Sequence, residues 1–180
     1  MLRKLTVVCA LALAVASLVS VERASGALFE YYRNGTLIYG QIRGNCGYQC
    51  VTSWYRAGSG NGTNACEPYN WIPIGGYSVP FHADNYGGSL IQGRVWRLSD
   101  YQCSNGVRRT ELFVHSQETY WQGQDCPSGY PGDFCWDTDN DYYSHGCIKV
   151  ARMPVPSDLR ALDTFEHSLN GPVTQVWVYG

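Results

Sequence analysis

Cysteines placed behind an export signal constrain this chain more than any other feature of its sequence. An apolar run from Leu5 to Val19 follows two basic residues, and small residues precede Ala27. This pattern is typical of a secretory signal peptide, here residues 1–26. An uncleaved membrane anchor is disfavoured because the run is shorter than the roughly 20 residues of a spanning helix. We therefore expect residues 27–180 to fold in an oxidising compartment, where paired cysteines become disulfides.

The exported part of the chain contains an odd number of cysteines. Cys9 leaves with the signal peptide, so at least one thiol stays unpaired and is a candidate reactive group. Cys126 and Cys135 lie close together in a loop containing Gly and Pro, and we expect them to form one bridge. Two further bridges are expected, with their pairing left open, among Cys46, Cys50, Cys66 and Cys103. The seventh cysteine is Cys147.

Residues 27–180 are long enough for one domain with a hydrophobic core. Of the 13 basic and 15 acidic residues, this part of the chain keeps 10 and 14, a net charge of about −4. Such a mild acidic excess argues against a nucleic-acid partner, which would need a concentrated basic surface. No second apolar segment approaches membrane-spanning length. We expect a monomer without stable membrane insertion.

Strand signals dominate the sequence and predict a mostly β domain with one or two short helices. Asn34-Gly35 is a strong hairpin-turn signal between two apolar runs. One helix is predicted from a cap at Ser157, with Leu159, Leu162, Phe165 and Leu169 at helical spacing, and Asn170-Gly171 ends it. Two glycine-containing segments, 44–66 and 116–143, are predicted to be loops. The predicted strands are 28–33, 36–42, 76–81, 90–98, 111–115 and 173–179.

The residues that carry chemistry are Ser144-His145-Gly146-Cys147. A cysteine nucleophile acts as a thiolate, and a nearby histidine can accept its proton. His115 ends an apolar predicted strand, a rigid element that could direct an imidazole at Cys147. Glycine before the cysteine lets backbone N–H groups approach a developing oxyanion. The alternatives are a buried structural cysteine and a strand-end histidine satisfied by its neighbours.

At these residues the chain resembles the L,D-transpeptidases, the YkuD-type cysteine enzymes of bacterial peptidoglycan. The matching motifs are Val114-His115-Ser116 and Ser144-His145-Gly146-Cys147-Ile148. Upstream, Ile72-Pro73-Ile74-Gly75-Gly76-Tyr77 is similar to a segment near the start of that domain. The resemblance covers roughly residues 71–179. It implies a disulfide-stapled, L,D-transpeptidase-like β-sandwich, secreted or located in the bacterial cell envelope.

The resemblance also implies roles for individual residues. Cys147 would be the nucleophile and His115 its proton acceptor, with Ser116 orienting His115. The N–H groups of Gly146 and Cys147 would form the oxyanion hole, while Ser144 and His145 shape the turn. Lys149 would contact substrate where the family has Arg or Asn, although lysine lacks arginine's planar fork. Peptidoglycan stem peptides would be the substrate, joined through a thioester on Cys147 without a cofactor.

Other functions stay open from the sequence. Water in place of an amine acceptor would make the protein an L,D-carboxypeptidase. A disulfide-rich carbohydrate-binding module is a further alternative, because six tryptophans could stack on sugars. A papain-like peptidase is disfavoured because His115 precedes Cys147 in the chain.

If His115 and Cys147 meet, residues 116–143 form a closed loop beside the nucleophile. Its aromatic residues Trp121, Tyr130, Trp136, Tyr142 and Tyr143 would then offer a surface to substrate.

No metal site is predicted. The chain has no C-x-x-C pair, so Cys46 and Cys50 are a weak zinc signature. Asp137, Asp139 and Asp141 alternate like the start of a calcium loop, but Tyr142 occupies the position that needs glycine. His82 and His167 receive no role.

Overall fold

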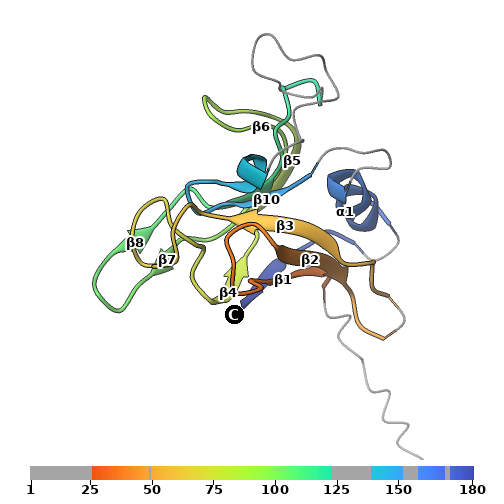
Figure 1. Ribbon diagram of the computed structural model, residues 1–180. Helices are drawn as coiled ribbons and strands as arrows, with labels where there is room; N and C mark the ends of the chain where they lie inside the picture. Colours follow the sequence, from red (N-terminus) through yellow and green to blue (C-terminus); the bar gives the residue numbers. More distant parts are fainter. Residues whose placement is uncertain (1–25, 49, 123–138, 152–157, 169–170) are drawn as a thin grey trace, which may run out of the picture.

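The computed structural model describes residues 26–48, 50–122, 139–151, 158–168 and 171–180 (Figure 1). The expected signal peptide and the Cys126–Cys135 bridge therefore lie outside the described residues, apart from Gly26. The described chain is mostly β, as predicted, with one α-helix and one 3-10 turn. Its elements are β1 Leu28–Tyr32, β2 Gly40–Asn45, β3 Tyr55–Ser59, β4 Gly75–Ser78, β5 Phe81–Gly87, β6 Gln92–Arg97, β7 Tyr101–Gln102, β8 Arg108–Arg109, β9 Phe113–His115, η1 Asp139–Tyr142, β10 Ile148–Val150, α1 Asp158–Glu166 and β11 Gln175–Tyr179.

Nine of these strands form one sheet in the order β4-β11-β1-β2-β3-β10-β9-β6-β5. The pairs β1–β11 and β9–β10 are parallel, and the other neighbours are antiparallel. β7 and β8 form a separate hairpin, which lies at the opposite end of the molecule from α1 (Figure 1). β9 and β10 thus lie inside the sheet, each paired on both sides, so residues at their ends are held by rigid neighbours.

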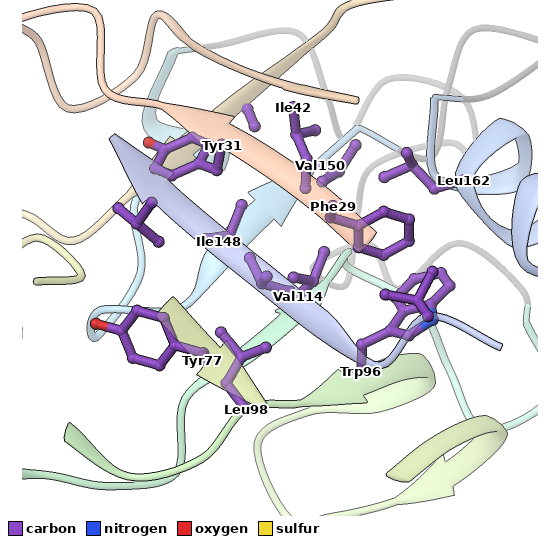
Figure 2. Close-up of a cluster of buried hydrophobic side chains, with 14 of the residues drawn as sticks. Phe29, Tyr31, Ile42, Tyr77, Trp96, Leu98, Val114, Ile148, Val150 and Leu162 are labelled. Atoms are coloured by element: carbon purple, nitrogen blue, oxygen red, sulfur yellow. The ribbon is translucent and has the colours of Figure 1, made fainter. Parts of the chain in front are cut away.

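The sheet curls around one hydrophobic core (Figure 2). Tyr77 of β4 and Trp96 of β6 come from opposite parts of the strand order, yet both belong to this core. Phe29 of β1 packs edge-on against Trp96, with ring centroids 5.1 Å apart. Such closure by curling lets a single sheet bury its inner face without a second sheet. Each fully buried large side chain contributes about 1.5–3 kcal/mol to folding.

The predicted helix is confirmed over its described part. Leu159, Leu162 and Phe165 of α1 are buried in the core at the expected spacing. Gly44 of β2 allows this close packing, because a Cβ there would overlap the Phe165 ring, 2.5 Å away at the nearest atom. The predicted cap Ser157 and the residues Leu169 and Asn170 lie outside the described residues. Gly171 adopts a φ of 78°, the left-handed conformation expected of a helix-ending glycine.

The predicted hairpin at Asn34-Gly35 is only partly right. Gly35 has the positive φ of a turn, but β2 starts at Gly40, so residues 36–39 belong to the connection. The register instead pairs Tyr31 with Ile42, and both side chains are fully buried. Burial of the inward-facing residues sets strand register, and here it overrides the short-turn signal.

The sequence analysis missed several strands: β3, β7, β8, β10 and all of β5 beyond Phe81. Two of them, β3 and β10, show why. β3 lies in the predicted loop 44–66, and its residues 57–59 are buried without alternation. Gly58 is required there because a Cβ would overlap Tyr142. β10 is only three residues long, and all three are buried. A short strand buried on both faces shows no period of two, so its sequence carries no strand pattern.

Two cysteine pairs lie at disulfide distance. Cys46 pairs with Cys50, and Cys66 pairs with Cys103. These are the four cysteines that were expected to supply two bridges, and the structure selects one of the possible pairings. Among the described cysteines, Cys147 is the free one. No helix in the described part of the chain is long and apolar enough to cross a membrane.

Candidate active site

The expected nucleophile and base lie on one face of the sheet. β10 and β9 are parallel neighbours, with Lys149 opposite His115 and Ile148 opposite Val114. Val114 and Ile148 point into the main core. Side chains alternate along a strand, so Phe113, His115 and Lys149 point to the other face. Cys147, directly before β10, joins that face, where it packs with Phe113 and with Val95 of β6.

The turn before Cys147 is built around the Ser144 hydroxyl. Ser144 Oγ accepts hydrogen bonds from the N–H groups of Gly60, at 2.9 Å, and Gly146, at 3.1 Å. It donates to the carbonyl oxygen of Cys147, at 2.6 Å. One hydroxyl has one proton and two lone pairs, so its capacity is fully used. Ser144 thus shapes the turn, as the resemblance implied.

Gly146 is required in this turn for two reasons. Its φ is 107°, a conformation that residues with a side chain rarely adopt. A Cβ at this position would also overlap the guanidinium of Arg109. Its N–H is already donated to Ser144 Oγ, so a role in an oxyanion hole would require that hydrogen bond to break.

Arg109 is a site residue that the sequence analysis missed. Its buried guanidinium donates to the carbonyl oxygens of Ala65, Asn70, Trp71 and His145. Arg109 therefore ties the segment before Ile72 to the turn before Cys147. An arginine in the two-residue strand β8 carries no sequence pattern for this role, because its acceptors are backbone carbonyls from distant parts of the chain.

Ser59 makes a second connection between the same two segments. Its hydroxyl donates to the carbonyl oxygen of Gly146, at 3.3 Å, and accepts from the N–H of Ile72, at 3.0 Å. Ile72 is the first residue of the segment Ile72–Tyr77, which resembles a segment near the start of the L,D-transpeptidase domain. Ser59 thus brings the upstream resembling segment next to the turn before Cys147, and Arg109 holds the residues directly before that segment to the same turn.

His115 is buried and held in a defined tautomer by its own neighbour. Its Nδ1 lies 2.8 Å from the carbonyl oxygen of Ser116, which can only accept, so Nδ1 carries the proton and Nε2 is an acceptor. Burial, reinforced by the positive charge of Lys149, lowers the pKa of His115 to about 4. The imidazole is therefore neutral at physiological pH.

Ser116 orients His115 through its backbone and not through its side chain. The carbonyl oxygen makes the hydrogen bond, while the buried hydroxyl has no hydrogen-bond partner among the described residues. The orienting role predicted for Ser116 therefore does not depend on the identity of its side chain.

Cys147 rests as a neutral thiol. Its side chain is 5% exposed, and Sγ lies 3.5 Å from the carbonyl oxygen of Glu111, to which the thiol can donate. Burial raises the pKa of Cys147 to about 11, although a hydrogen bond with the Phe113 backbone and the charges of Lys149, Arg97 and Arg109 lower it in part. The thiol hydrogen bond in this state is thus directed to Glu111 and not to His115.

Lys149 lies on the sheet face beside His115 and not on an open surface. It is 7% exposed, and burial lowers its pKa to about 8, opposed by the charges of Asp141 and Cys147. The sequence analysis expected Lys149 to contact substrate. That expectation stays a prediction. The position of Lys149 puts a positive charge on the sheet face that carries His115 and Cys147.

The other predicted site features are only partly described. His145 is exposed and packs edge-on against Tyr69, with ring centroids 4.4 Å apart. Tyr142 is buried beneath Arg56, so it does not belong to the predicted aromatic surface. Trp121 is 82% exposed and contacts Tyr120, as that surface would require. Tyr130, Trp136 and Asp137 lie outside the described residues.

Comparisons of this chain with protein-family models, curated proteins and solved structures found no match. The chemistry of the site must therefore be argued from its own residues.

Proposed function

We propose that this protein is a cysteine acyltransferase in which Cys147 forms a thioester and His115 accepts the thiol proton. The observation that carries the proposal is the shared sheet face. A free cysteine and a histidine with an acceptor Nε2 lie on the same side of two neighbouring parallel strands. Covalent catalysis uses this arrangement: rigid elements hold the nucleophile and the base, and a third group orients the base.

The motifs shared with the L,D-transpeptidases indicate the substrate class. On that basis the substrates are peptidoglycan stem peptides, and the protein works outside the cell or in the bacterial cell envelope. The same motifs favour an L,D-transpeptidase-like β-sandwich as the finer fold class. Ser59 supports this assignment, because its hydroxyl joins Ile72 of the upstream resembling segment to Gly146 of the other.

The chemistry follows from the resting protonation states. As the sulfur attacks a peptide carbonyl, the thiol proton passes to Nε2 of His115, and a C–S bond forms. The tetrahedral intermediate then breaks its C–N bond, and the imidazolium returns the proton to the leaving amine. An acceptor amine then attacks the thioester and gives its proton to His115. The C–S bond breaks, an amide forms, and His115 returns the proton to the departing sulfur. The positive charge of Lys149 stabilises the anionic sulfur during both steps.

Mass spectrometry after incubation with a carbapenem tests the proposal, because carbapenems acylate the cysteine of the resembled family. We expect one adduct, mapped to Cys147 and absent in Cys147→Ser. His115→Ala should slow acylation by about 100-fold or more, the usual contribution of a general base. Thr164→Ala, at an exposed position of α1 outside this site, is the control and should react at the wild-type rate. A folded protein without an adduct, or a disulfide containing Cys147, would refute the proposal.

A further inference from the structure

A second cluster of titratable residues lies where the edge strand β5 meets α1. His82 and Asp84 project from the same side of β5, two residues apart, and Asp163 and His167 are one helical turn apart. Ligand atoms of His82, Asp84 and His167 all lie within 4.8 Å of one another. His82 Nε2 is 3.3 Å from Asp84 Oδ1 and 3.8 Å from Asp163 Oδ1. His167 Nε2 is 3.9 Å from Asp84 Oδ2.

Three atoms at the centre of this cluster are buried without a hydrogen-bond partner among the described residues. They are His82 Nε2, Asp84 Oδ1 and Asp163 Oδ1. Buried polar atoms in folded proteins are almost always paired, so three that face one another indicate a missing group. A single cation between them would satisfy all three at once.

Both histidines are held as metal-binding histidines are. His82 Nδ1 lies 3.3 Å from Glu166 Oε1, and the other oxygen of Glu166 accepts from the indole of Trp96. The His82 ring is also stacked on Trp96, with centroids 4.7 Å apart. His167 Nδ1 lies 2.9 Å from the carbonyl oxygen of Asp163. In each ring Nδ1 is occupied by an acceptor, which leaves Nε2 to bind a metal.

The charge of the cluster also favours a cation. Asp84, Asp163 and Glu166 contribute three carboxylates. Arg94 compensates part of this charge, with Nε 3.1 Å from Asp163 Oδ2, but its guanidinium also pairs with the buried Glu118. Neutral histidines would leave an excess of negative charge in a partly buried place.

We propose that His82, Asp84, Asp163 and His167 bind a divalent transition metal of the zinc type. Imidazole nitrogen with carboxylate oxygen is a ligand set that Zn²⁺ takes in fourfold coordination. Bonds of about 2.0–2.1 Å in a tetrahedron put ligand atoms about 3.3 Å apart. Three of the observed separations are 3.3–3.9 Å. The ligand atoms of His82, Asp84 and His167 lie within 4.8 Å of one another, so these side chains and Asp163 would move inward on a bound metal. The metal joins β5 to α1.

This site is separate from the proposed acyltransferase site. Trp96, which stacks on His82, points into the main core, whereas its neighbour Val95 packs with Cys147 on the other face of β6. Metal binding therefore does not depend on the proposed function, and either can fail without the other.

Calorimetric titration of the disulfide-intact, chelator-treated protein with Zn²⁺ tests the site. We expect one ion per chain, a higher melting temperature, and a Co²⁺ spectrum without a thiolate charge-transfer band. Asp84→Asn and His167→Gln, both at partly exposed positions, should each weaken binding by at least 10-fold, and the double variant should abolish it. Glu166→Gln, which removes the outer carboxylate, should weaken binding by about 10-fold or more.

Matched controls use an acid and a histidine outside the cluster. Asp100→Asn and His145→Gln should leave the Zn²⁺ dissociation constant within 2-fold of wild type. The competing account is that protons on the two histidines balance the carboxylates. In that case the melting temperature would rise as the pH falls towards 6, and Zn²⁺ would have no effect. That result, or Zn²⁺ binding that survives in the double variant, would overturn the proposal.

Discussion

At the scale of single residues, the turn of the candidate active site depends on a few positions where another residue type would break a hydrogen bond or overlap a neighbour. Ser144 uses every hydrogen-bonding capacity of its hydroxyl, and Gly146 has both a left-handed backbone and no space for a Cβ. Arg109 fills the space beside that glycine. The serine and glycine that the resemblance singled out thus have a physical reason that is independent of catalysis.

Gly146→Ala should destabilise the protein more than a positive φ alone would. The matched variant is Gly106→Ala, where φ is 87° but no atom lies within 4 Å of the added Cβ. We expect about 1 kcal/mol for Gly106→Ala, as for an alanine placed at positive φ. Gly146→Ala should cost about 2–3 kcal/mol more, since overpacking against Arg109 adds to the strain. Urea denaturation measures both, and equal losses would contradict the close contact with Arg109.

Alkylation of Cys147 should be slow at neutral pH and rise steeply above pH 9. A thiol whose pKa is raised to about 11 is far less ionised at pH 7 than an ordinary cysteine. We expect iodoacetamide to react with the native protein at least about 100-fold more slowly than with the unfolded, disulfide-intact chain. Cys147→Ser should show no labelling in either state. Equal rates at pH 7 would mean that the thiol is not a buried neutral group.

Burial of His115 should make the protein sensitive to acid. Its pKa is about 4 in the folded state and 6.5 in the unfolded chain, so between these values the unfolded state binds the extra proton. The free energy of unfolding should therefore fall as the pH decreases from 6.5 to 4, by up to about 3 kcal/mol from this group. His115→Gln should remove this part of the pH dependence. A variant with the same slope as wild type would contradict it.

At the scale of elements, rigid strands position the site, and α1 covers the core beside it. β9 and β10 lie side by side in the sheet although many residues separate them in the chain, and their register sets Lys149 opposite His115. α1 buries Leu159, Leu162 and Phe165 against strands from both parts of the curled sheet. The helix also presents Asp163 and His167 to β5, so its packing positions the proposed metal ligands.

Leu162→Ala should destabilise the protein by about 2–5 kcal/mol, the usual cost of a cavity in a packed core. Leu162 is fully buried in the core cluster that also contains Phe29 and Trp96 (Figure 2). Thr164→Ala, at an exposed position of the same helix, should change the free energy of unfolding by less than about 0.5 kcal/mol. Chemical denaturation compares the two. Similar losses would mean that α1 is not packed as described.

At the scale of the whole molecule, the two described bridges restrain loops of very different length. Cys46–Cys50 closes a short loop after β2, whereas Cys66–Cys103 spans 37 positions of the chain. The longer bridge fixes the segment whose carbonyl groups Arg109 holds, since Ala65 directly precedes Cys66. The Cys66–Cys103 bridge therefore stabilises the fold and also holds in place the segment that Arg109 joins to the turn before Cys147.

Removal of the longer bridge should cost more stability than removal of the shorter one. Chain entropy predicts about 4 kcal/mol for Cys66→Ser with Cys103→Ser, and about 2 kcal/mol for Cys46→Ser with Cys50→Ser. The second pair serves as the control for loss of a disulfide as such. Thermal and urea unfolding of both double variants give the comparison. A larger loss for the short bridge would refute loop entropy as the main contribution.

The sequence by itself determined the features that depend on local pattern or on counting. Aromatic and β-branched content predicted a mostly β chain, helical spacing predicted α1, and an odd cysteine count predicted a free thiol. Each of these follows from neighbouring residues or from composition, so no long-range contact is needed to recognise it. The resemblance around Cys147 proposed His115 as its partner, and that role stays a prediction.

Only the tertiary structure decided what depends on residues far apart in the chain. It selected the pairing of the four described disulfide cysteines and set the register of β1 with β2 through burial of Ile42. It also buried Lys149 beside His115 and directed the Arg109 guanidinium to four carbonyl groups. His82-Ala83-Asp84 and the pair Asp163 and His167 are unremarkable in sequence, because two ligands at such spacing do not make a site. The four residues form the proposed site only because β5 and α1 lie side by side, since a metal needs ligands that are close in space and not in sequence.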